Sequence, residues 1–389
     1  MRNEELKARM IPSENLTNII TTKSYNAYEQ FYLEARSITG LVCYPIACSI
    51  GLIGNTMSII VMTQKQMQSS TNIYLLALAF SDSIKLINDF LYFVVILLME
   101  IDKRTGESLY QGLYPYAHYI FNTSLCISAW ITVSVAVERY VYVCKPLYVK
   151  SYCTIHRARI ITVCVYFFMS MLSIPYAMRY QSYEVYDNRT NQTLLDLSVT
   201  KLWQNNVFSR AYTWFQNLIR SVIPLLTLIV LNTCIMCGIR RCKLSKSKNM
   251  RRYRITIMLV CVVLVFMVCI SPDAIMSTIL GFGYIEEDYL TRGIREITDL
   301  LLLINSAVNF ILYCIFNTIF WKNFLHIFCA ICIKIYCPHH QMNVSTPSRQ
   351  LQSNVYREVQ LATFPGTHHF KLVSVKRGNG EIYEEMQSS

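Results

Sequence analysis

The sequence predicts an all-α membrane protein, folded as a bundle of seven transmembrane helices. Of its 389 residues, 53% are hydrophobic and only 15% are charged, which is more apolar sequence than a soluble core of this size needs. The apolar residues gather into runs of about 20 residues or more, the length that crosses the hydrocarbon core of a bilayer. Seven such runs occur, at residues 38–63, 72–99, 114–143, 157–178, 208–238, 255–282 and 295–317.

The parts of the chain outside these runs are polar or amphipathic. After the seventh run, Phe320, Phe324 and Phe328 recur every four residues with polar side chains between them, which predicts an amphipathic helix on a membrane surface. The final stretch is polar and is predicted to be disordered. The expected parts are an extracellular N-terminal tail (1–37), the helical bundle (38–317), the amphipathic helix (318–337) and a disordered cytoplasmic tail (338–389).

Lys and Arg in the short loops predict the orientation of the bundle. The connector 239–254 carries eight basic residues and no acid, and the loop 144–159 carries four, again without an acid. Basic loops stay in the cytoplasm, so we expect a plasma-membrane protein with its N-terminus outside and its C-terminus inside. The formal net charge of +12 is then explained by loops that face anionic membrane lipid. No nucleic-acid-binding signature accompanies that charge, so no nucleic-acid partner is expected.

Six candidate modification sites agree with this orientation. Three N-glycosylation sequons fall in segments predicted to be extracellular, and three cysteines lie near the inner membrane surface, where palmitoylation occurs. Unmodified thiols are the alternative for each of these cysteines. The sites are Asn15, Asn188 and Asn191 for glycosylation, and Cys329, Cys332 and Cys337 for palmitoylation.

The placement of cysteine and histidine limits the other chemistry that we expect. None of the fifteen cysteines falls in the four outer segments, 1–37, 100–113, 179–207 and 283–295, so no extracellular disulfide is predicted. The seven histidines are scattered, and no set of three converges on a metal. A membrane hydrolase is therefore disfavoured, and no enzyme activity is expected. An odd number of spans without an internal repeat argues against a transporter.

An acid and a base stand side by side in the stretch AVERYVYVCKPL, where the third apolar run ends. Glu138 and Arg139 lie at the predicted inner end of that run, where they meet water and headgroups. An adjacent acid can hold an Arg in place, and releasing the Arg frees a cation for another partner, so the pair suits a two-state switch. An ordinary interfacial ion pair is the alternative.

These residues belong to a set of motifs that stand in order along the seven runs. The set resembles the rhodopsin-like (class A) G-protein-coupled receptors over residues 38–330. Within that family, TNIYLLALAFSD, WITVSVAVERYVYVCKPL and INSAVNFILYC resemble the invertebrate FMRFamide and related neuropeptide receptors, and an orphan branch thought to sense aromatic amino acids or peptides. The motifs are Gly54-Asn55, LALAFSD ending at Asp82, Glu138-Arg139-Tyr140, Pro146-Leu147, Pro224, Phe266 with Pro272, and Asn309 with Tyr313.

The resemblance implies how the inner end of the bundle works. Glu138 restrains Arg139 in the resting state, and on activation Arg139 turns inward while a cavity opens for a helix of a heterotrimeric G protein. Leu147 offers that partner an apolar contact. Pro224 and Pro272 remove backbone hydrogen bonds and create bends about which the inner halves of the helices swing. The residues implied in this switch are Glu138, Arg139, Tyr140, Leu147, Phe266, Asn309 and Tyr313.

A polar group in the middle of the bundle is implied to hold sodium and water. Asp82 is costly inside a membrane unless it is paired or hydrated. With Asn55, Ser306 and Asn309 it resembles the family's site for an allosteric sodium ion; a plain hydrogen bond between helices is the alternative. No other cofactor is expected.

Four positions depart from the family's pattern. Tyr114 stands near the level of the usual cysteine at the outer end of the third span, and the fourth span has Tyr166 in place of Trp. Ile270 replaces the usual Trp of the sixth span, and Phe310 replaces the proline that follows Asn309. The Trp rotamer switch of the family therefore does not apply to this chain as it stands.

Two ligand classes are disfavoured by single positions. Phe121 stands where receptors for amines carry an Asp, and the seventh run, 295–317, contains no Lys that would bind retinal. Several charges nevertheless lie in the outer halves of the spans, where ionisable groups usually mark a ligand path. The candidate ligand-binding residues are Phe121, Asn122, His118, Arg220, Ile270, Asp273, Asp299, Lys85 and Asp89.

The charges suggest a ligand that carries a cation. We expect Asp273 and Asp299 to receive a cationic group such as a peptide Arg, while Arg220 binds a carbonyl or an acid. The alternatives are that Lys85 pairs with Asp89, one turn along the same helix, and that Arg220 pairs with Asp273 or Asp299 and only ties helices together.

The predicted function is a receptor for a short extracellular neuropeptide, amidated and Arg-containing in the favoured version, that activates heterotrimeric G proteins. The alternative is a receptor for a small molecule such as an aromatic amino acid. Arrestin and membrane lipid are further expected partners, with Ser and Thr of the C-terminal tail as the sites that recruit arrestin after phosphorylation.

Overall fold

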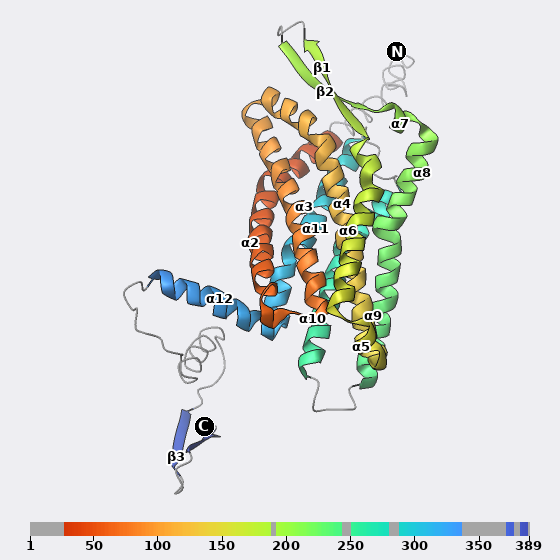
Figure 1. Cartoon of the computed structure of the whole chain (residues 1–389). Coiled ribbons are helices and arrows are strands. Elements are labelled where there is room, and N and C mark those ends of the chain that lie inside the picture. The colour runs from red at the N-terminus through yellow and green to blue at the C-terminus, as the bar shows by residue number, and fades with distance from the viewer. Residues whose placement is uncertain are drawn as a thin grey trace, which may run out of the picture. The chain divides into compact units, whose positions relative to one another are not determined.

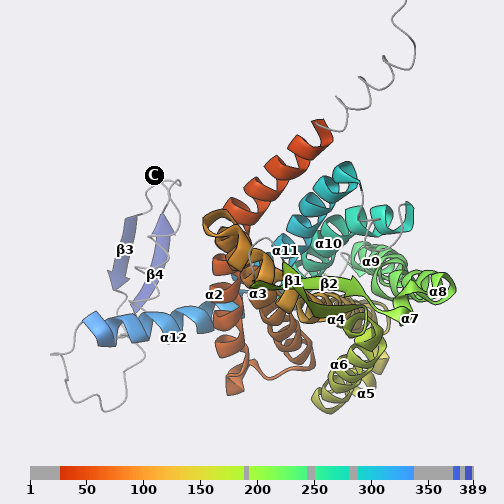
Figure 2. The same cartoon turned by 90° about the horizontal axis from the view of Figure 1, so that it is seen from above.

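Within the residues that the structure describes, seven long helical segments run side by side (Figure 1), and Figure 2 views the bundle end-on. The computed structural model describes residues 27–187, 192–242, 250–279, 288–336, 371–376 and 382–387. The chain divides into two units, Met1–Phe328 and Cys329–Ser389, and the bundle belongs to the first. The segments are Ala27–Met62, which contains η2 (Ile38–Cys43) and α2 (Tyr44–Met62); α3 (Ser70–Ile101); α4 (Lys103–Cys144); α6 (Ile155–Ala177); α8 (Asn206–Asn217) with η5 (Leu218–Val222) and α9 (Ile223–Cys242); α10 (Met250–Ile279); and α11 (Tyr289–Phe316).

The predicted seven-helix membrane bundle is confirmed. Six of the segments are long and apolar enough to cross a membrane. The remaining one, α3, carries Asp82, Lys85 and Asp89 in its middle, and all three side chains are buried. Because α3 packs against α2, α4, α6 and α11, its charges face protein and not lipid.

Several helices are longer than the apolar runs that predicted them. α4 begins at Lys103, not at residue 114, and α11 begins at Tyr289, not at residue 295. The length of an apolar run reflects the thickness of the membrane. A helix can extend beyond that run into water, until a capping residue ends it. Asp102 provides the cap of α4 by accepting hydrogen bonds from the Arg104 amide (3.2 Å) and the Thr105 hydroxyl (2.5 Å). The Thr105 hydrogen bond lowers the pKa of the exposed Asp102 carboxyl.

Small elements connect the long helices, among them the strands β1 and β2. β1 and β2 form an antiparallel pair in which Tyr180 lies opposite Val199. We call the end of the bundle that carries this pair the outer end, since the sequence predicts it to be extracellular. Tyr183 of β1 donates a hydrogen bond to Asp196 of β2 (2.9 Å), which raises the pKa of the tyrosine. The elements are η3 (Lys65–Met67), η4 (Pro146–Tyr148), α5 (Val149–Tyr152), β1 (Tyr180–Asp187), β2 (Gln192–Val199) and α7 (Lys201–Gln204).

The fifth helical segment widens just before its proline. η5 is a π-helical stretch that ends two residues before Pro224. Proline has no N–H to donate to the preceding turn, and the wider turn accommodates this loss. The widening lies at Arg220, which is buried in the bundle.

The helix α12 (Thr318–Tyr336) follows α11 and lies where the sequence predicts an amphipathic helix. Asn317 caps it by accepting hydrogen bonds from the amides of Ile319 (3.2 Å) and Phe320 (3.1 Å). Phe320 is fully buried, with its ring centroid 5.7 Å from that of Tyr313 in α11. The capping residue and the buried aromatic ring therefore fix the first turn of α12.

The second unit contains two strands where the sequence predicts disorder. β3 (Lys371–Lys376) and β4 (Ile382–Gln387) pair antiparallel, with Lys371 opposite Gln387. The prediction of a disordered tail is wrong for these two segments, because Val373 and Val375 in KLVSVK favour an extended backbone over both helix and coil. The rest of 338–389 lies outside the described residues.

We expect Gly51→Ala to destabilise the bundle. A Cβ at Gly51 would lie 2.7 Å from Leu86 Cδ1 and 2.9 Å from the backbone Cα of Ala307, so α2 would have to move away from α11. Overpacking of this kind costs about 1–3 kcal/mol. Thermal unfolding of the purified protein measures the loss.

Gly112→Ala is the matched control, because its Cβ would meet only Leu195 Cδ1 at 3.8 Å, an ordinary contact. Equal unfolding temperatures for the two variants would contradict the close packing at Gly51.

Candidate functional site

A cavity of about 340 Å³ lies at the outer end of the bundle. Helices from both ends of the chain form its walls, and β2 contributes one residue. The helical extension before η2 takes part because Phe31 rests on Gly293 of α11, which has no side chain to block it. The lining residues are Tyr32, Tyr44, Asn88, Asp89, Tyr92, Tyr110, Tyr114, Ala117, His118, Phe121, Leu197, Arg292, Arg295, Glu296 and Asp299.

Tyrosine dominates the wall of the cavity. Tyr44 and Tyr92 have ring centroids 5.6 Å apart, and Tyr110 and Tyr114 have centroids 4.9 Å apart. Tyr32 lies under the guanidinium of Arg292, which is 4.6 Å from the ring centroid. Such rings offer apolar faces together with hydroxyl groups, so this wall suits a ligand that is partly aromatic and partly polar.

The acids of the wall differ in how firmly they are held. Lys85 Nζ is 2.5 Å from Asp89 Oδ2, and both side chains are almost fully buried. Arg295 Nε is 3.7 Å from Asp299 Oδ2, and both of these side chains are partly exposed. Glu296 accepts hydrogen bonds from Tyr92 (2.9 Å) and Thr39 (3.4 Å). The pair at Asp299 is therefore the looser and more accessible of the two ion pairs.

A separate buried network binds Arg220 of η5. Its guanidinium pairs with Asp273 of α10 and donates a hydrogen bond to Asn122 Oδ1 (3.2 Å). Asn122 in turn donates to the backbone carbonyl of His118 (2.8 Å). Arg220 thus pairs with Asp273, which is one of the two alternatives for Arg220 left open above. That Asp273 receives a ligand cation stays a prediction.

The predicted ligand residues thus separate into two groups, with Ile270 in neither. His118, Phe121, Asp89 and Asp299 line the cavity. Lys85 does not line it, but its ammonium contacts two of these residues, Asp89 and Phe121. Asn122, Arg220 and Asp273 form the buried network. Ile270 is 4% exposed and packs in a hydrophobic cluster with Phe266 and Leu302, because an aliphatic side chain fills the core where the family's Trp would stand.

Sequence reasoning missed three charged residues of the cavity, Arg292, Arg295 and Glu296. Arg292, Glu296 and the predicted Asp299 lie four and three residues apart, which is the spacing of one helical face. Arg292 lies before residue 295, where the seventh apolar run was expected to begin, so its place on that face was not recognised. The tyrosines carry no comparable signal, since their meeting depends on how the helices pack.

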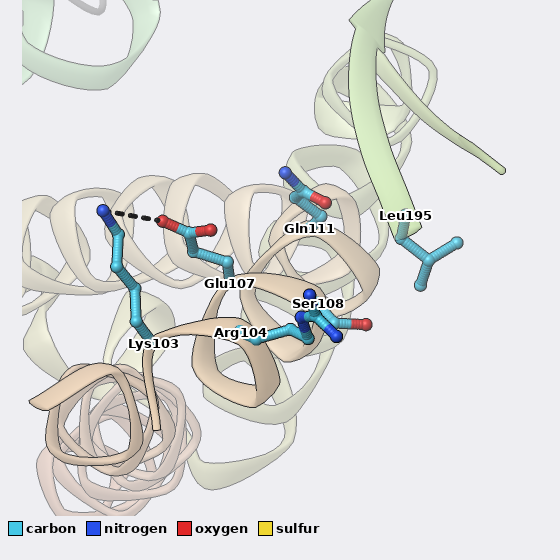
Figure 3. A pocket seen from close by; sticks show the side chains of 6 residues that line it. All are labelled: Lys103, Arg104, Glu107, Ser108, Gln111 and Leu195. Atoms are coloured by element: carbon cyan, nitrogen blue, oxygen red, sulfur yellow. Dashed lines mark ion pairs between the residues drawn. The ribbon is translucent and has the colours of Figure 1, made fainter. Parts of the chain in front are cut away.

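A second groove lies on the outer surface of the bundle (Figure 3). It encloses about 350 Å³. Lys103 Nζ is 3.8 Å from Glu107 Oε1, the pair drawn as a dashed line, and both side chains are exposed. Exposed ion pairs of this kind contribute little binding energy, so the groove is a weaker candidate than the tyrosine-lined cavity. Its lining residues are Lys103, Arg104, Glu107, Ser108, Gln111 and Leu195.

An aromatic junction occupies the place where the family usually has a disulfide. Tyr114 of α4 meets Tyr180 of β1 edge-on, with ring centroids 5.1 Å apart. His118, one turn further into α4, contacts Tyr180 at 5.6 Å and Tyr176 of α6 at 5.1 Å, both edge-on. The end of β1 is therefore held against α4 by ring contacts.

The polar group around Asp82 lies deeper in the bundle. Asp82 accepts hydrogen bonds from the Ser128 hydroxyl (2.9 Å) and the Asn309 amide (2.8 Å). Asn55 donates to the Ser306 carbonyl (3.1 Å), and its own side-chain oxygen has no hydrogen-bond partner among the described residues. Carboxylate, hydroxyl and amide oxygens are the ligands of hard cations. The donor chemistry of Asp82, Ser128 and Asn55 therefore fits the sodium ion that the resemblance implies.

Glu138 and Arg139 lie buried at the inner end of α4. The Ser70 hydroxyl donates a hydrogen bond to Glu138, and the Arg139 guanidinium donates one to the Thr71 hydroxyl. Arg139 Nη2 is 3.6 Å from Glu138 Oε2, and its guanidinium lies 4.5 Å from the Tyr142 ring centroid. The first turn of α3 thus holds both charges, a contact that the sequence motif does not predict.

The other predicted switch residues surround this pair or lie above it. Tyr140 packs against Ile235 and Ile239 of α9, and Leu147 of η4 is 93% exposed. Phe266, Asn309 and Tyr313 are buried. An exposed apolar side chain such as Leu147 is available to a partner, whereas the buried residues act only through movement of the helices.

Two of the departures have a local explanation. Tyr166 of α6 donates a hydrogen bond to the Ala77 carbonyl of α3 (2.7 Å), so its hydroxyl ties the two helices together. Phe310 packs against Gly54 of α2, where a Cβ would lie 2.8 Å from Phe310 Cβ, and its ring centroid lies 5.5 Å from that of Phe324. The position that follows Asn309 is therefore a packing contact of α11.

Comparison with known proteins identifies the family. Residues 54–313 match the family described as 7 transmembrane receptor (rhodopsin family). The chain belongs to this family. The predicted resemblance is therefore confirmed. This is a family of membrane receptors and not of enzymes.

Three relatives of this receptor illustrate its place in the family. It is 31% identical to the FMRFamide receptor of Drosophila melanogaster, over 72% of this chain and 52% of that protein, so the match spans about half the length of this relative. It is 30% identical to the probable G-protein coupled receptor frpr-1 of Caenorhabditis elegans, over 77% of this chain and 80% of that protein. It is 25% identical to the sex peptide receptor of Drosophila melanogaster, over 74% and 71%.

Some predicted sites of this receptor lie outside the described structure. Asn15, Asn188, Asn191 and Cys337 are outside the described residues, and the side chains of Cys329 and Cys332 in α12 are not described. Their modification stays a prediction.

We expect Tyr114 and Tyr180 to be energetically coupled. In a double-mutant cycle with Tyr114→Leu and Tyr180→Leu, the coupling energy measured by unfolding should be about 0.5–1.5 kcal/mol, because the edge-on contact is lost once and not twice.

Tyr148→Leu combined with Tyr180→Leu provides the control. Tyr148 belongs to η4, far from β1, so these two effects should add. Additivity in the Tyr114–Tyr180 cycle as well would contradict the aromatic junction.

Proposed function

We propose that this protein is a plasma-membrane receptor that binds a short extracellular peptide in the tyrosine-lined cavity and activates heterotrimeric G proteins. The observation that carries the proposal is the cavity itself, with its tyrosines and its partly exposed Arg295–Asp299 pair. The relatives named as receptors for FMRFamide and sex peptide favour a peptide over a free amino acid. A cavity of about 340 Å³ has room for one or two side chains of such a peptide.

Asp299 is the proposed anchor for a cationic group of the ligand, such as the guanidinium of a peptide Arg. Its distance of 3.7 Å from Arg295 and its partial exposure mean that a ligand cation can replace Arg295 without leaving a carboxylate unpaired. Asp89 is a poorer anchor because the buried Lys85 ammonium lies 2.5 Å from it. Arg295, once displaced, can bind a carbonyl or carboxylate of the same ligand.

The inner site is the proposed output. Thr71, Ser70 and Glu138 hold Arg139 in a buried position that is closed to a partner. Separation of the first turn of α3 from α4 would release the guanidinium toward the inner face. Leu147, exposed at the same end, would then give the G protein an apolar contact.

The remaining parts of the proposal rest on the sequence. The basic connectors favour a cytoplasmic C-terminus and contact with anionic lipid, and the sequons favour glycosylation of the outer segments. Palmitoylation at Cys329, Cys332 and Cys337 and arrestin binding to the phosphorylated tail are also part of the proposal.

Asp299→Asn should weaken an Arg-containing amidated peptide about ten-fold more than the same peptide with citrulline in place of Arg, since only the guanidinium loses a charged partner. Concentration–response curves for calcium and cyclic-AMP signals in cells, at equal surface expression, measure the difference.

Glu107→Gln makes the same charge change on the exposed outer groove and should affect both peptides equally. Equal losses for the two peptides in Asp299→Asn would overturn the proposed anchor. A response to Trp or Phe with none to any peptide would overturn the peptide ligand and leave a receptor for aromatic amino acids.

A further inference from the structure

A buried cation lies between the outer cavity and the polar group at Asp82. Lys85 is 1% exposed, and its ammonium is 2.5 Å from Asp89 and 5.1 Å from the ring centroid of Phe121. Asp89 and Phe121 both line the floor of the cavity. Lys85 thus lies directly beneath the cavity and is covered by two of its lining residues.

Asp82 lies one turn further into the bundle on the same helix. Residues three apart on a helix share a face, so Lys85 and Asp82 point to the same side of α3. Asp82 is fully buried and already accepts hydrogen bonds from two neutral donors, Ser128 and Asn309. On this face of α3, Lys85 therefore stands between Asp82 and Asp89, which lines the cavity.

A site for a metal ion requires suitable ligands and also an entry path. The oxygens around Asp82 meet the first requirement for sodium. Lys85 opposes the second requirement, the entry path, because a fixed positive charge in a medium of low dielectric repels a second cation. Some channels exclude cations in this way. Asp89 holds the ammonium in place, so the barrier is part of the fold.

We propose that Lys85 is the resident cation of this bundle and keeps sodium from binding at Asp82. The inference depends only on α3 and its neighbours, and not on the identity of the ligand. It makes this receptor indifferent to sodium, although its Asp82 group has the oxygen donors that the ion requires.

The test compares unfolding temperatures of the purified full-length protein in sodium chloride and in potassium chloride at equal concentration. An ion that binds only the folded protein raises the unfolding temperature. The wild-type protein should unfold at the same temperature in both salts. The double variant Lys85→Met with Asp89→Asn, which removes the pair without leaving an unpaired charge, should unfold about 2–4 °C higher in sodium.

Two further variants sharpen the test. Lys85→Arg keeps the cation and should stay indifferent to sodium. Adding Asp82→Asn to the double variant should abolish its sodium response, because the carboxylate that binds the ion is gone.

Two results would overturn the inference. A wild-type protein that sodium stabilises over potassium would show that Lys85 does not keep the ion out, and this result requires no variant to fold. A double variant that ignores sodium would show that Lys85 is not the reason for the indifference.

Discussion

Polar side chains in the middle of a membrane bundle find partners only in neighbouring helices, because lipid offers none. This constraint applies most strongly to α3. Asp82 is satisfied by α4 and α11, Lys85 by Asp89 and the ring of Phe121, and the residues of its first turn by Glu138 and Arg139. The rest of the bundle is arranged so that these contacts form, which explains why α3, with three buried charges in its middle, packs against four other helices.

These contacts divide the bundle into levels from the outer end to the inner end. The cavity holds loosely paired charges at its rim and a tightly paired Lys85 at its floor. Below it lies the hydrogen-bonded group at Asp82, and at the inner end lies Arg139. A ligand at the rim therefore exchanges a weak ion pair, whereas a signal to the inner end has to move whole helices, since the side chains of the intermediate levels are buried.

The chain adopts the receptor fold although other contacts replace several structural features that are typical of the family. Ring contacts between Tyr114 and Tyr180 hold β1 at the place of a disulfide. Ile270 fills the core where a Trp would stand, and Phe310 packs against Gly54 where a proline would stand. Each replacement is a packing contact, so the bundle depends more on close fit than on covalent links or special backbone geometry.

The sequence predicts the bundle well because membrane length and the order of motifs are local properties of the chain. It also names Asp89, His118, Phe121 and Asp299, and all four line the outer cavity. It does not decide which acid is available to a ligand, because the pairing of Arg220 with Asp273 depends on how η5 and α10 meet in space. The tyrosine wall and the contact of Arg139 with Thr71 are hidden for the same reason, since both join segments far apart in the sequence.

The most direct test of the central claim, that occupancy of the outer cavity is transmitted to Arg139, is nucleotide exchange on a purified G protein. The purified receptor would be mixed with the heterotrimer, with and without a short amidated Arg-containing peptide, and compared with Arg139→Ala. The account predicts that the peptide accelerates exchange in the wild-type receptor and that Arg139→Ala still binds the peptide but no longer accelerates exchange. Undiminished acceleration by Arg139→Ala, or peptide binding without any acceleration by the wild-type receptor, would contradict it.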